Sequence, residues 1–310
     1  MKLKLINFIL LSGLLFFYSK LSAQEEPLAC AEENSVDSEI FVDNPKFITY
    51  AHPSSFDWSD PITKMPQDFL AFSKHAFSKD NFPTLASLTF LTTLLIATDH
   101  ESIYSLRKEY RSSRTFHDIA KKTTYLGDGE FHLGMAALFG GAGLIFKDNR
   151  ALRTAVQIVE AELVTGITVQ ILKRITGRES PQSASINGGK FRPFPNLGDY
   201  HRDQPKYYSY PSGHVSTSMA VLTVIAENYP EIKWIKPVGY SLVGLIGVGL
   251  AARGWHWLSD YPLAVALGYT FGKVITERNI PDPADDDHEY GISFQPVMKN
   301  GPGFGLVYKF

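Results

Sequence analysis

Apolar residues recur along this chain in six long runs, separated by polar segments. The runs cover residues 84–98, 131–146, 152–172, 215–226, 237–252 and 261–276. Each run is a candidate helix, and no internal repeat of fixed period connects them. The pattern therefore predicts an all-α fold, an antiparallel helical bundle with six core apolar helices.

The first residues have the pattern of a secretory signal. Lys2 and Lys4 precede an apolar stretch at 5–18, and Ala23 ends a small-residue segment. We predict a signal peptide over 1–23 that is removed after Ala23, with an uncleaved anchor as the alternative. Both interpretations predict that the rest of the chain lies in an extracytoplasmic space such as the periplasm.

The chain around the six runs divides into further segments. Residues 24–80 are an irregular lead-in with one amphipathic helix near 66–78, where Phe69, Phe72 and Phe77 share a face. Residues 99–130 are polar and contain another helix. The predicted catalytic domain covers 81–280. Residues 281–310 begin as an acidic linker and end in a small C-terminal β-hairpin around an Asn-Gly turn.

The segment from Tyr208 to His214 reads Tyr-Ser-Tyr-Pro-Ser-Gly-His and directly precedes an apolar run. Helix N-terminal amides lack intrahelical acceptors, and together with the helix dipole they favour an anion beside them. A histidine at this place can also move a proton near neutral pH. The segment is therefore a candidate phosphate cradle, although the same residues would also suit an ordinary helix start.

Two cationic segments at the ends of other apolar runs accompany it. One contains Lys173 and Arg178, and the other contains Arg253, His256 and Asp260. Antiparallel packing of consecutive helices would bring all three segments to one end of the bundle. We therefore expect a single site there.

These ordered motifs resemble the type 2 phosphatidic acid phosphatases, a superfamily that also includes bacterial class A acid phosphatases and vanadium haloperoxidases. The resemblance covers roughly residues 80–278. It implies that His256 is the nucleophile, oriented by Asp260, and that His214 is the general acid. It also implies that the phosphoryl oxygens are held by cations and by the start of the helix. The predicted contacts are Lys173, Arg178, Ser212, Gly213 and Arg253.

Two positions depart from the family pattern. Ser180 stands where the family has an arginine before a proline, and Leu250 stands where an arginine precedes the histidine by six residues. Developing charge on a phosphoryl group calls for a cation, and an arginine offers paired donors. We therefore predict that Arg178 replaces the missing group at Ser180 and that Arg253 contributes from the other motif.

Composition limits the alternatives. The chain has 310 residues with 30 basic and 32 acidic side chains, so no general attraction to nucleic acid is expected. Cys30 is the only cysteine, which excludes an intrachain disulfide. The proposed chemistry needs no metal or other cofactor. His100, His117, His132 and His201 lack metal-ligand spacing, and we interpret them as surface residues.

The sequence allows two relations to a membrane, in which the helices either span it or rest on its surface. Several runs fall short of the roughly 20 apolar residues that a bilayer core needs, and Glu160 and Glu162 interrupt one of them. This favours an exported domain that rests on a membrane surface, with an integral membrane protein as the alternative. The sequence does not indicate the oligomeric state.

The function predicted from these patterns is a phosphatase for phosphate monoesters or pyrophosphates, including lipid-linked ones, with a phosphorylated small molecule or lipid as its partner. An alternative enzymatic function is that of a vanadate-dependent haloperoxidase, because vanadate resembles a phosphoryl transition state. A non-enzymatic alternative is a phosphate-binding module without catalytic activity, because Ser180 and Leu250 depart from the family pattern.

Overall fold

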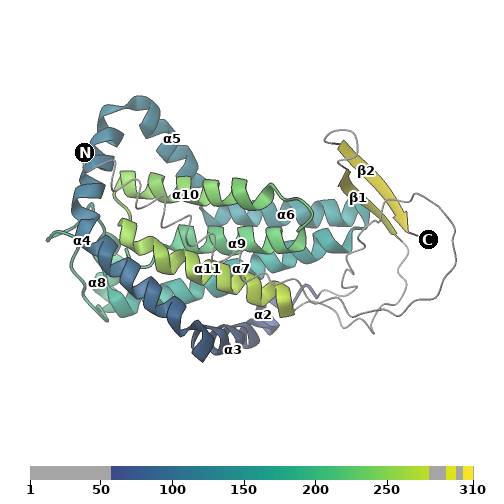
Figure 1. Ribbon diagram of the computed structural model, residues 1–310, viewed down its shortest axis with the longest axis horizontal. Coiled ribbons are helices and arrows are strands. Elements are labelled where there is room, and N and C mark those ends of the chain that lie inside the picture. Colours follow the sequence, from purple (N-terminus) through teal and green to yellow (C-terminus); the bar gives the residue numbers. More distant parts are fainter. Residues whose placement is uncertain (1–56, 279–290, 298–302, 310) are drawn as a thin grey trace, which may run out of the picture. The chain divides into compact units, whose positions relative to one another are not determined.

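The computed structural model describes residues 57–278, 291–297 and 303–309. The predicted signal peptide, most of the lead-in, the acidic linker and the Asn-Gly turn lie outside these residues. Within them the regular elements are helices, connected by loops, and two strands at the end (Figure 1). The elements are α2 (Asp60–Thr63), α3 (Met65–Ala76), η1 (Lys79–Asn81), α4 (Phe82–Ser112), α5 (Arg114–Tyr125), α6 (Gly129–Phe146), α7 (Asn149–Thr176), α8 (Leu197–Arg202), η2 (Gln204–Lys206), α9 (Gly213–Asn228), α10 (Ile235–Arg253), η3 (Leu258–Asp260), α11 (Tyr261–Arg278), β1 (Gly291–Val297) and β2 (Gly303–Lys309).

The six apolar runs all lie within helices, namely α4, α6, α7, α9, α10 and α11. The first helix differs from its prediction. The apolar run was expected to end near Thr98, but α4 continues through the polar stretch to Ser112. The separate helix predicted in that stretch is α5, which begins where the Ser113 hydroxyl accepts a hydrogen bond from the Phe116 amide at 3.2 Å. The strands β1 and β2 pair antiparallel, with Gly291 opposite Lys309.

Helix α9 lies at the centre of the packing. It contacts α7, α10 and α11, which run beside it in Figure 1. Ala220 and Val224 of α9 are fully buried against Ile158 of α7 and Phe271 of α11. Phe72 of α3 stacks on Phe271 with ring centroids 4.2 Å apart, so this helix covers the core where an amphipathic helix was predicted. The core thus fixes the α9 N-terminus, which carries the phosphate-cradle motif.

The α9–α11 pair is parallel, as expected for helices two apart in a bundle whose consecutive helices are antiparallel. Gly268 faces Ser216 and Gly272 faces Thr223, so both helices advance in the same direction. The reason is the connectivity, because α10 returns the chain to the end where α9 began. An added Cβ at Gly268 would lie 2.1 Å from the Ser216 carbonyl oxygen. Glycine therefore permits the close approach of these two helices.

Among the described residues, four helices are long and apolar enough to cross a membrane, by length and composition: Lys79–Ser112, which includes η1 and α4, and α6, α7 and α10. The expectation that the runs are too short to span is wrong for these helices. Their outer faces are apolar and exposed. Leu163, Ile167, Ile171 and Ile175 follow one stripe of α7 at four-residue spacing. Such a stripe suits contact with lipid.

Three hydroxyl side chains on the exposed part of α4 form hydrogen bonds within the helix. The hydroxyls of Ser87, Thr89 and Thr93 donate hydrogen bonds to carbonyls one turn earlier, at 2.8 to 2.9 Å. Because lipid offers no hydrogen-bond partners, internal satisfaction lowers the cost of placing such groups in a bilayer. The α4 surface is thus chemically compatible with a membrane despite its hydroxyls.

We expect Gly268→Ala to destabilise the protein by about 1 to 3 kcal/mol, because the added methyl group forces α9 and α11 apart. Gly244→Ala is the matched control. Gly244 also lies within a helix, but an added Cβ there meets nothing within 4 Å. Thermal unfolding in detergent, followed by circular dichroism, measures both. Equal unfolding midpoints for the two variants would contradict the close packing of α9 on α11.

Candidate active site

The end of α7 directs two cationic side chains. Gly177 adopts φ 54°, a left-handed conformation that ends the helix, and an added Cβ there would lie 1.8 Å from the Arg192 carbonyl oxygen. Lys173 stays in the last turn of α7. Arg178 leaves the helix and forms isolated β-bridges with Phe191 and Tyr208. Lys173 thus extends from a helix, whereas Arg178 extends from a segment that forms β-bridges.

The start of α9 has the features of an anion site. Ser212 is the N-cap residue, and its hydroxyl is buried without a hydrogen-bond partner among the described residues. The Lys173 ammonium lies 3.6 Å from an added Cβ at Gly213 and 4.1 Å from the Tyr208 ring centroid. A buried cation, an unpaired hydroxyl and a helix N-terminus therefore converge where the sequence predicts the phosphate cradle.

His256 lies in a loop that connects α10 to the single 3₁₀ turn η3. His256 and Asp260 are four residues apart, but no α-helix joins them. His256 Nδ1 is 2.7 Å from the Ser209 carbonyl oxygen and 3.4 Å from Asp260 Oδ2. A carbonyl can only accept, so Nδ1 carries the proton. Nε2 then has the lone pair that a nucleophile needs.

The surroundings of His256 favour its neutral form. Burial lowers the pKa of His256 below its usual value, and the nearby charge of Lys173 lowers it further. The hydrogen bond to Asp260 acts in the opposite direction and raises this pKa. Because the net direction is downward, the imidazole stays unprotonated to a lower pH than a free histidine. A neutral imidazole is the form that can attack phosphorus.

Asp260 is fully buried and has a donor on each oxygen. Oδ1 accepts from the Arg178 guanidinium at 2.6 Å, and Oδ2 accepts from the Ser209 hydroxyl at 2.6 Å and the Trp257 amide at 2.8 Å. Burial alone would raise the pKa of Asp260, but the Arg178 charge and the hydrogen bond from His256 hold it below its usual value. This carboxylate therefore stays ionised and fixed beside His256.

Arg178 is fully buried, and its donors are engaged by protein groups. Besides Asp260, it donates to Asp99 Oδ2 at 2.9 Å, to the Ser259 hydroxyl at 2.6 Å and to the Gly188 carbonyl at 2.7 Å. This geometry differs from the predicted contact with a phosphoryl group. The Arg178 guanidinium is directed at Asp260 and Asp99.

Asp99 completes this cluster, and the sequence reasoning missed it. Its carboxylate is fully buried in α4 and also accepts hydrogen bonds from the Ser259 amide at 3.1 Å and the Ser259 hydroxyl. Asp99 lies 79 residues before Arg178. The only signal in the sequence is a single acid directly after an apolar run, which is also typical of an ordinary helix surface.

His214 occupies the second position of α9 and pairs with a residue that the sequence reasoning did not select. Its Nε2 lies 2.8 Å from Asp128 Oδ1, at the start of α6. Burial lowers the pKa of His214, whereas the Asp128 carboxylate raises it. The positive charge of Lys173 lowers the pKa of His214 as well as that of His256. Lys173 is therefore close enough to both histidines to affect their protonation.

A second histidine–carboxylate pair lies behind His214. His132 was interpreted as a surface residue, but it is buried, with Nδ1 2.8 Å from Glu162 Oε2. Its Nε2 lies 3.3 Å from the Ser218 hydroxyl, one turn along α9 from His214. Packing of α6 on α7 explains the difference, because these two side chains meet between the helices. Glu162 therefore has a partner inside the fold.

The structure also shows the position of Arg253, which was predicted to contact phosphate, of Ser180, which departs from the family pattern, and of the nearby Arg192. Arg253 is the last residue of α10, three before His256, and among the described residues it has no ion pair or hydrogen bond. Ser180 is buried, and both its amide and its hydroxyl donate to the Pro205 carbonyl, at 2.8 and 2.9 Å. Arg192 forms an ion pair with Glu179 at 2.5 Å. Arg253 thus remains an available cation for an anionic ligand.

No group of three or more histidine, cysteine or carboxylate side chains in the described part of the chain is arranged to hold a metal ion.

Comparison with solved structures finds a likeness to the first transmembrane PAP2 type phosphatidylglycerolphosphate phosphatase from Bacillus subtilis. The identity is 17%, the TM-score is 0.42, and the match covers 63% of this chain and 94% of that one.

Among curated proteins, a lipid A 1-phosphatase from Porphyromonas gingivalis is 29% identical over 90 residues. These amount to 29% of this chain and 19% of that protein, so the match spans about a fifth of the relative's length. The family model of the PAP2 superfamily matches residues 154–279. This range contains Lys173, Ser212 and His214, as well as His256 with Asp260, which the fold brings to one end of its helices. The region that carries these residues, 154–279, therefore matches the PAP2 superfamily.

Proposed function

We propose that this protein is a membrane-associated phosphatase that removes a phosphate group from a lipid-linked monoester or pyrophosphate. The observation that carries the proposal is the orientation of His256. Its Nδ1 is held by the Ser209 carbonyl at 2.7 Å, and Lys173 with the α9 N-terminus forms an anion site in the same electrostatic environment. A fixed nucleophile beside a phosphate cradle is what phosphoryl transfer requires.

The proposed reaction has two steps. His256 Nε2 attacks phosphorus, the bond between phosphorus and the leaving oxygen breaks, and His214 gives its proton to that oxygen. A phosphohistidine is the intermediate. Water then attacks the phosphohistidine, His214 takes a proton from that water, and inorganic phosphate leaves as the phosphorus–nitrogen bond breaks. Lys173, the Ser212 hydroxyl and the first α9 amides stabilise the charge on the phosphoryl oxygens, and Arg253 is the further cation within reach of this end.

The lipid-linked nature of the substrate is supported by the exposed apolar helices. In the part of the chain that the structure describes, four helices qualify as membrane spans by length and composition, and the site lies at the ends of two of them, α7 and α10. A phosphate at the polar end of a lipid would meet these helix ends while its acyl chains stay beside the apolar faces. The similarity to a lipid A 1-phosphatase agrees with a lipid substrate.

We expect His256→Ala and His214→Ala each to reduce turnover by about a thousandfold or more, because alanine can neither attack nor move a proton. His117→Ala is the control, since His117 is exposed and pairs only with its neighbour Asp118 among the described residues. Rapid quenching with a substrate labelled on phosphorus should trap label on His256 in the wild type. Near-normal turnover by His256→Ala would refute the mechanism.

The pH dependence should report the two histidines separately. His256 must be neutral to attack, so its protonation sets the acidic limb of the kcat/KM profile. His214 must be protonated to serve the leaving group, so its deprotonation sets the basic limb. Both pKa values are lowered, and the optimum should therefore lie on the acidic side of the ordinary histidine pKa.

Asp128→Asn tests this assignment. It removes the charge that raises the pKa of His214, so the basic limb should move to lower pH while the acidic limb stays in place. Asp118→Asn, which alters the exposed pair with His117, should leave both limbs unchanged. An unchanged basic limb in Asp128→Asn would show that His214 is not the acid.

The role of Arg178 can be separated from phosphate binding. Removing it would leave Asp99 and Asp260 as buried, uncompensated carboxylates, so Arg178→Ala should lose about 3 to 5 kcal/mol of stability together with activity. Arg202→Ala, at an exposed arginine, should change neither. If Arg178→Ala kept the wild-type unfolding midpoint but lost affinity for inorganic phosphate, Arg178 would be a phosphate ligand, as the sequence first suggested.

A further inference from the structure

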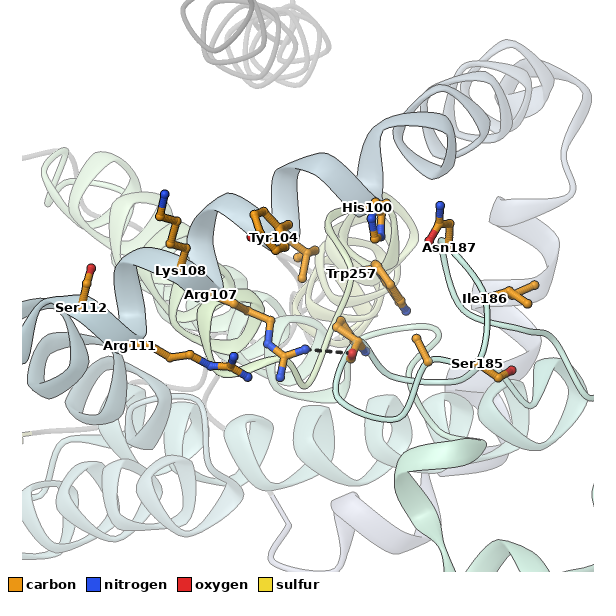
Figure 2. A pocket seen from close by; sticks show the side chains of 13 residues that line it. His100, Tyr104, Arg107, Lys108, Arg111, Ser112, Ser185, Ile186, Asn187 and Trp257 are labelled. Atoms are coloured by element: carbon orange, nitrogen blue, oxygen red, sulfur yellow. Dashed lines mark hydrogen bonds between the residues drawn. The ribbon is translucent and has the colours of Figure 1, made fainter.

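A second cationic pocket lies outside the site described above. It is a cavity of about 500 Å³ between α4 and the loop at 181–187, and Figure 2 shows its lining. Trp257, the residue after His256, forms part of its wall. Lys173, Ser212 and His214 do not line it, so it is distinct from the phosphate cradle.

The charged side chains that line this pocket are all positive among the described residues. Arg107, Lys108 and Arg111 line it, and no aspartate or glutamate is among its described lining residues. The acids of the same helix segment, Glu101 and Glu109, lie outside the lining. The cations are therefore gathered on the pocket face of α4, where each repels the others. An anion bound between them would relieve this repulsion.

The two arginines are held differently. Arg107 donates to the Pro181 carbonyl at 2.9 Å, drawn as a dashed line in Figure 2, and packs over Gly254, where an added Cβ would be 3.0 Å from the guanidinium carbon. Arg111 lies one turn later, is exposed, and has no ion pair or hydrogen bond among the described residues. One cation is thus fixed in place, and the next is available for a ligand.

Hydrogen bonds connect the wall of the pocket to the loop that carries His256, residues 254–257. The Gln182 amide donates to the Gly254 carbonyl at 3.0 Å, and the Trp257 indole donates to the Glu179 carbonyl at 2.7 Å. These bonds fix the 181–187 wall relative to His256. The pocket also lies on the polar part of α4, beyond the exposed apolar residues Phe82 to Ile96. That position matches the level of lipid headgroups in the proposed membrane setting.

We propose that this pocket is a second anion-binding site, which takes a phosphate group of the substrate's headgroup other than the one that is hydrolysed. The substrate class is then a lipid whose headgroup carries two phosphates. The inference rests on the proposed function, because it deepens the choice of substrate. Free inorganic phosphate has the same chemistry and is the other source of such an anion.

The experiment compares two substrates in mixed micelles with the full-length protein. One is a lipid with a single phosphate, and the other is a glycolipid with two phosphates on its sugar headgroup. Arg111→Gln should raise KM for the second by about tenfold, as the loss of one charge-assisted contact implies, and leave KM for the first and both kcat values unchanged. Arg111→Lys should recover part of the loss. Arg114→Gln, three residues on and outside the pocket lining, is the matched control.

A second measurement identifies the source of the anion. Calorimetric titration with inorganic phosphate should show two sites in the wild type if the pocket binds free phosphate, and one of them should disappear in Arg111→Gln. If that site disappears while the two lipids respond alike, the pocket takes free phosphate and the headgroup assignment is wrong. If Arg111→Gln affects neither the lipid comparison nor the titration, the pocket is not an anion site.

Failure of the proposed function has a different signature. A wild-type protein that hydrolyses neither lipid would refute the phosphatase assignment, and the phosphate titration would still decide whether the pocket binds an anion. A wild-type protein that hydrolyses both lipids, with equal changes for both in Arg111→Gln, would refute only the assignment of the pocket to a second headgroup phosphate, and the phosphatase assignment would stand.

Discussion

The site depends on one buried guanidinium. Arg178 lies between Asp99 and Asp260, and all three side chains are removed from solvent. Burying such charges is costly unless each has a partner, and the desolvation is offset here by hydrogen bonds from Ser209, Ser259 and a backbone amide. The same bonds join α4, the end of α7 and η3. Displacement of any one of these elements would leave a buried charge unpaired, so the geometry around His256 is strongly determined.

A short stretch of chain connects His256 to the start of α9. The Ser209 carbonyl accepts from His256, its hydroxyl donates to Asp260, and Ser212 three residues later begins α9. The Ser212 amide in turn donates to the Asp260 carbonyl at 3.2 Å. The position of His256 relative to the α9 N-terminus is therefore set by local contacts, with little contribution from the distant packing of the helices.

The parts of the site that sequence could predict are those with local signals. A Pro-Ser-Gly-His segment before an apolar run places a helix N-terminus, and helix order brings Lys173, His214 and His256 to one end. The contacts of Arg178 could not be predicted from the sequence, because an arginine that pairs with buried acids and one that binds phosphate have the same local pattern. Asp99 and Asp128 were missed for a related reason. Their partners lie 79 and 86 residues away, and a single acid beside a helix end is typical of solvent-exposed positions.

Helix α4 joins two chemically different zones in one rigid rod. Its exposed apolar part from Phe82 to Ile96 is about 21 Å long at the rise of an α-helix, and Asp99 follows within one turn. In a membrane, the depth at which the apolar part settles would fix the height of Asp99, and with it the height of His256 above the hydrocarbon. The enzyme would then act on phosphates at one level of the bilayer, and the dephosphorylated lipid would remain in its leaflet without being extracted.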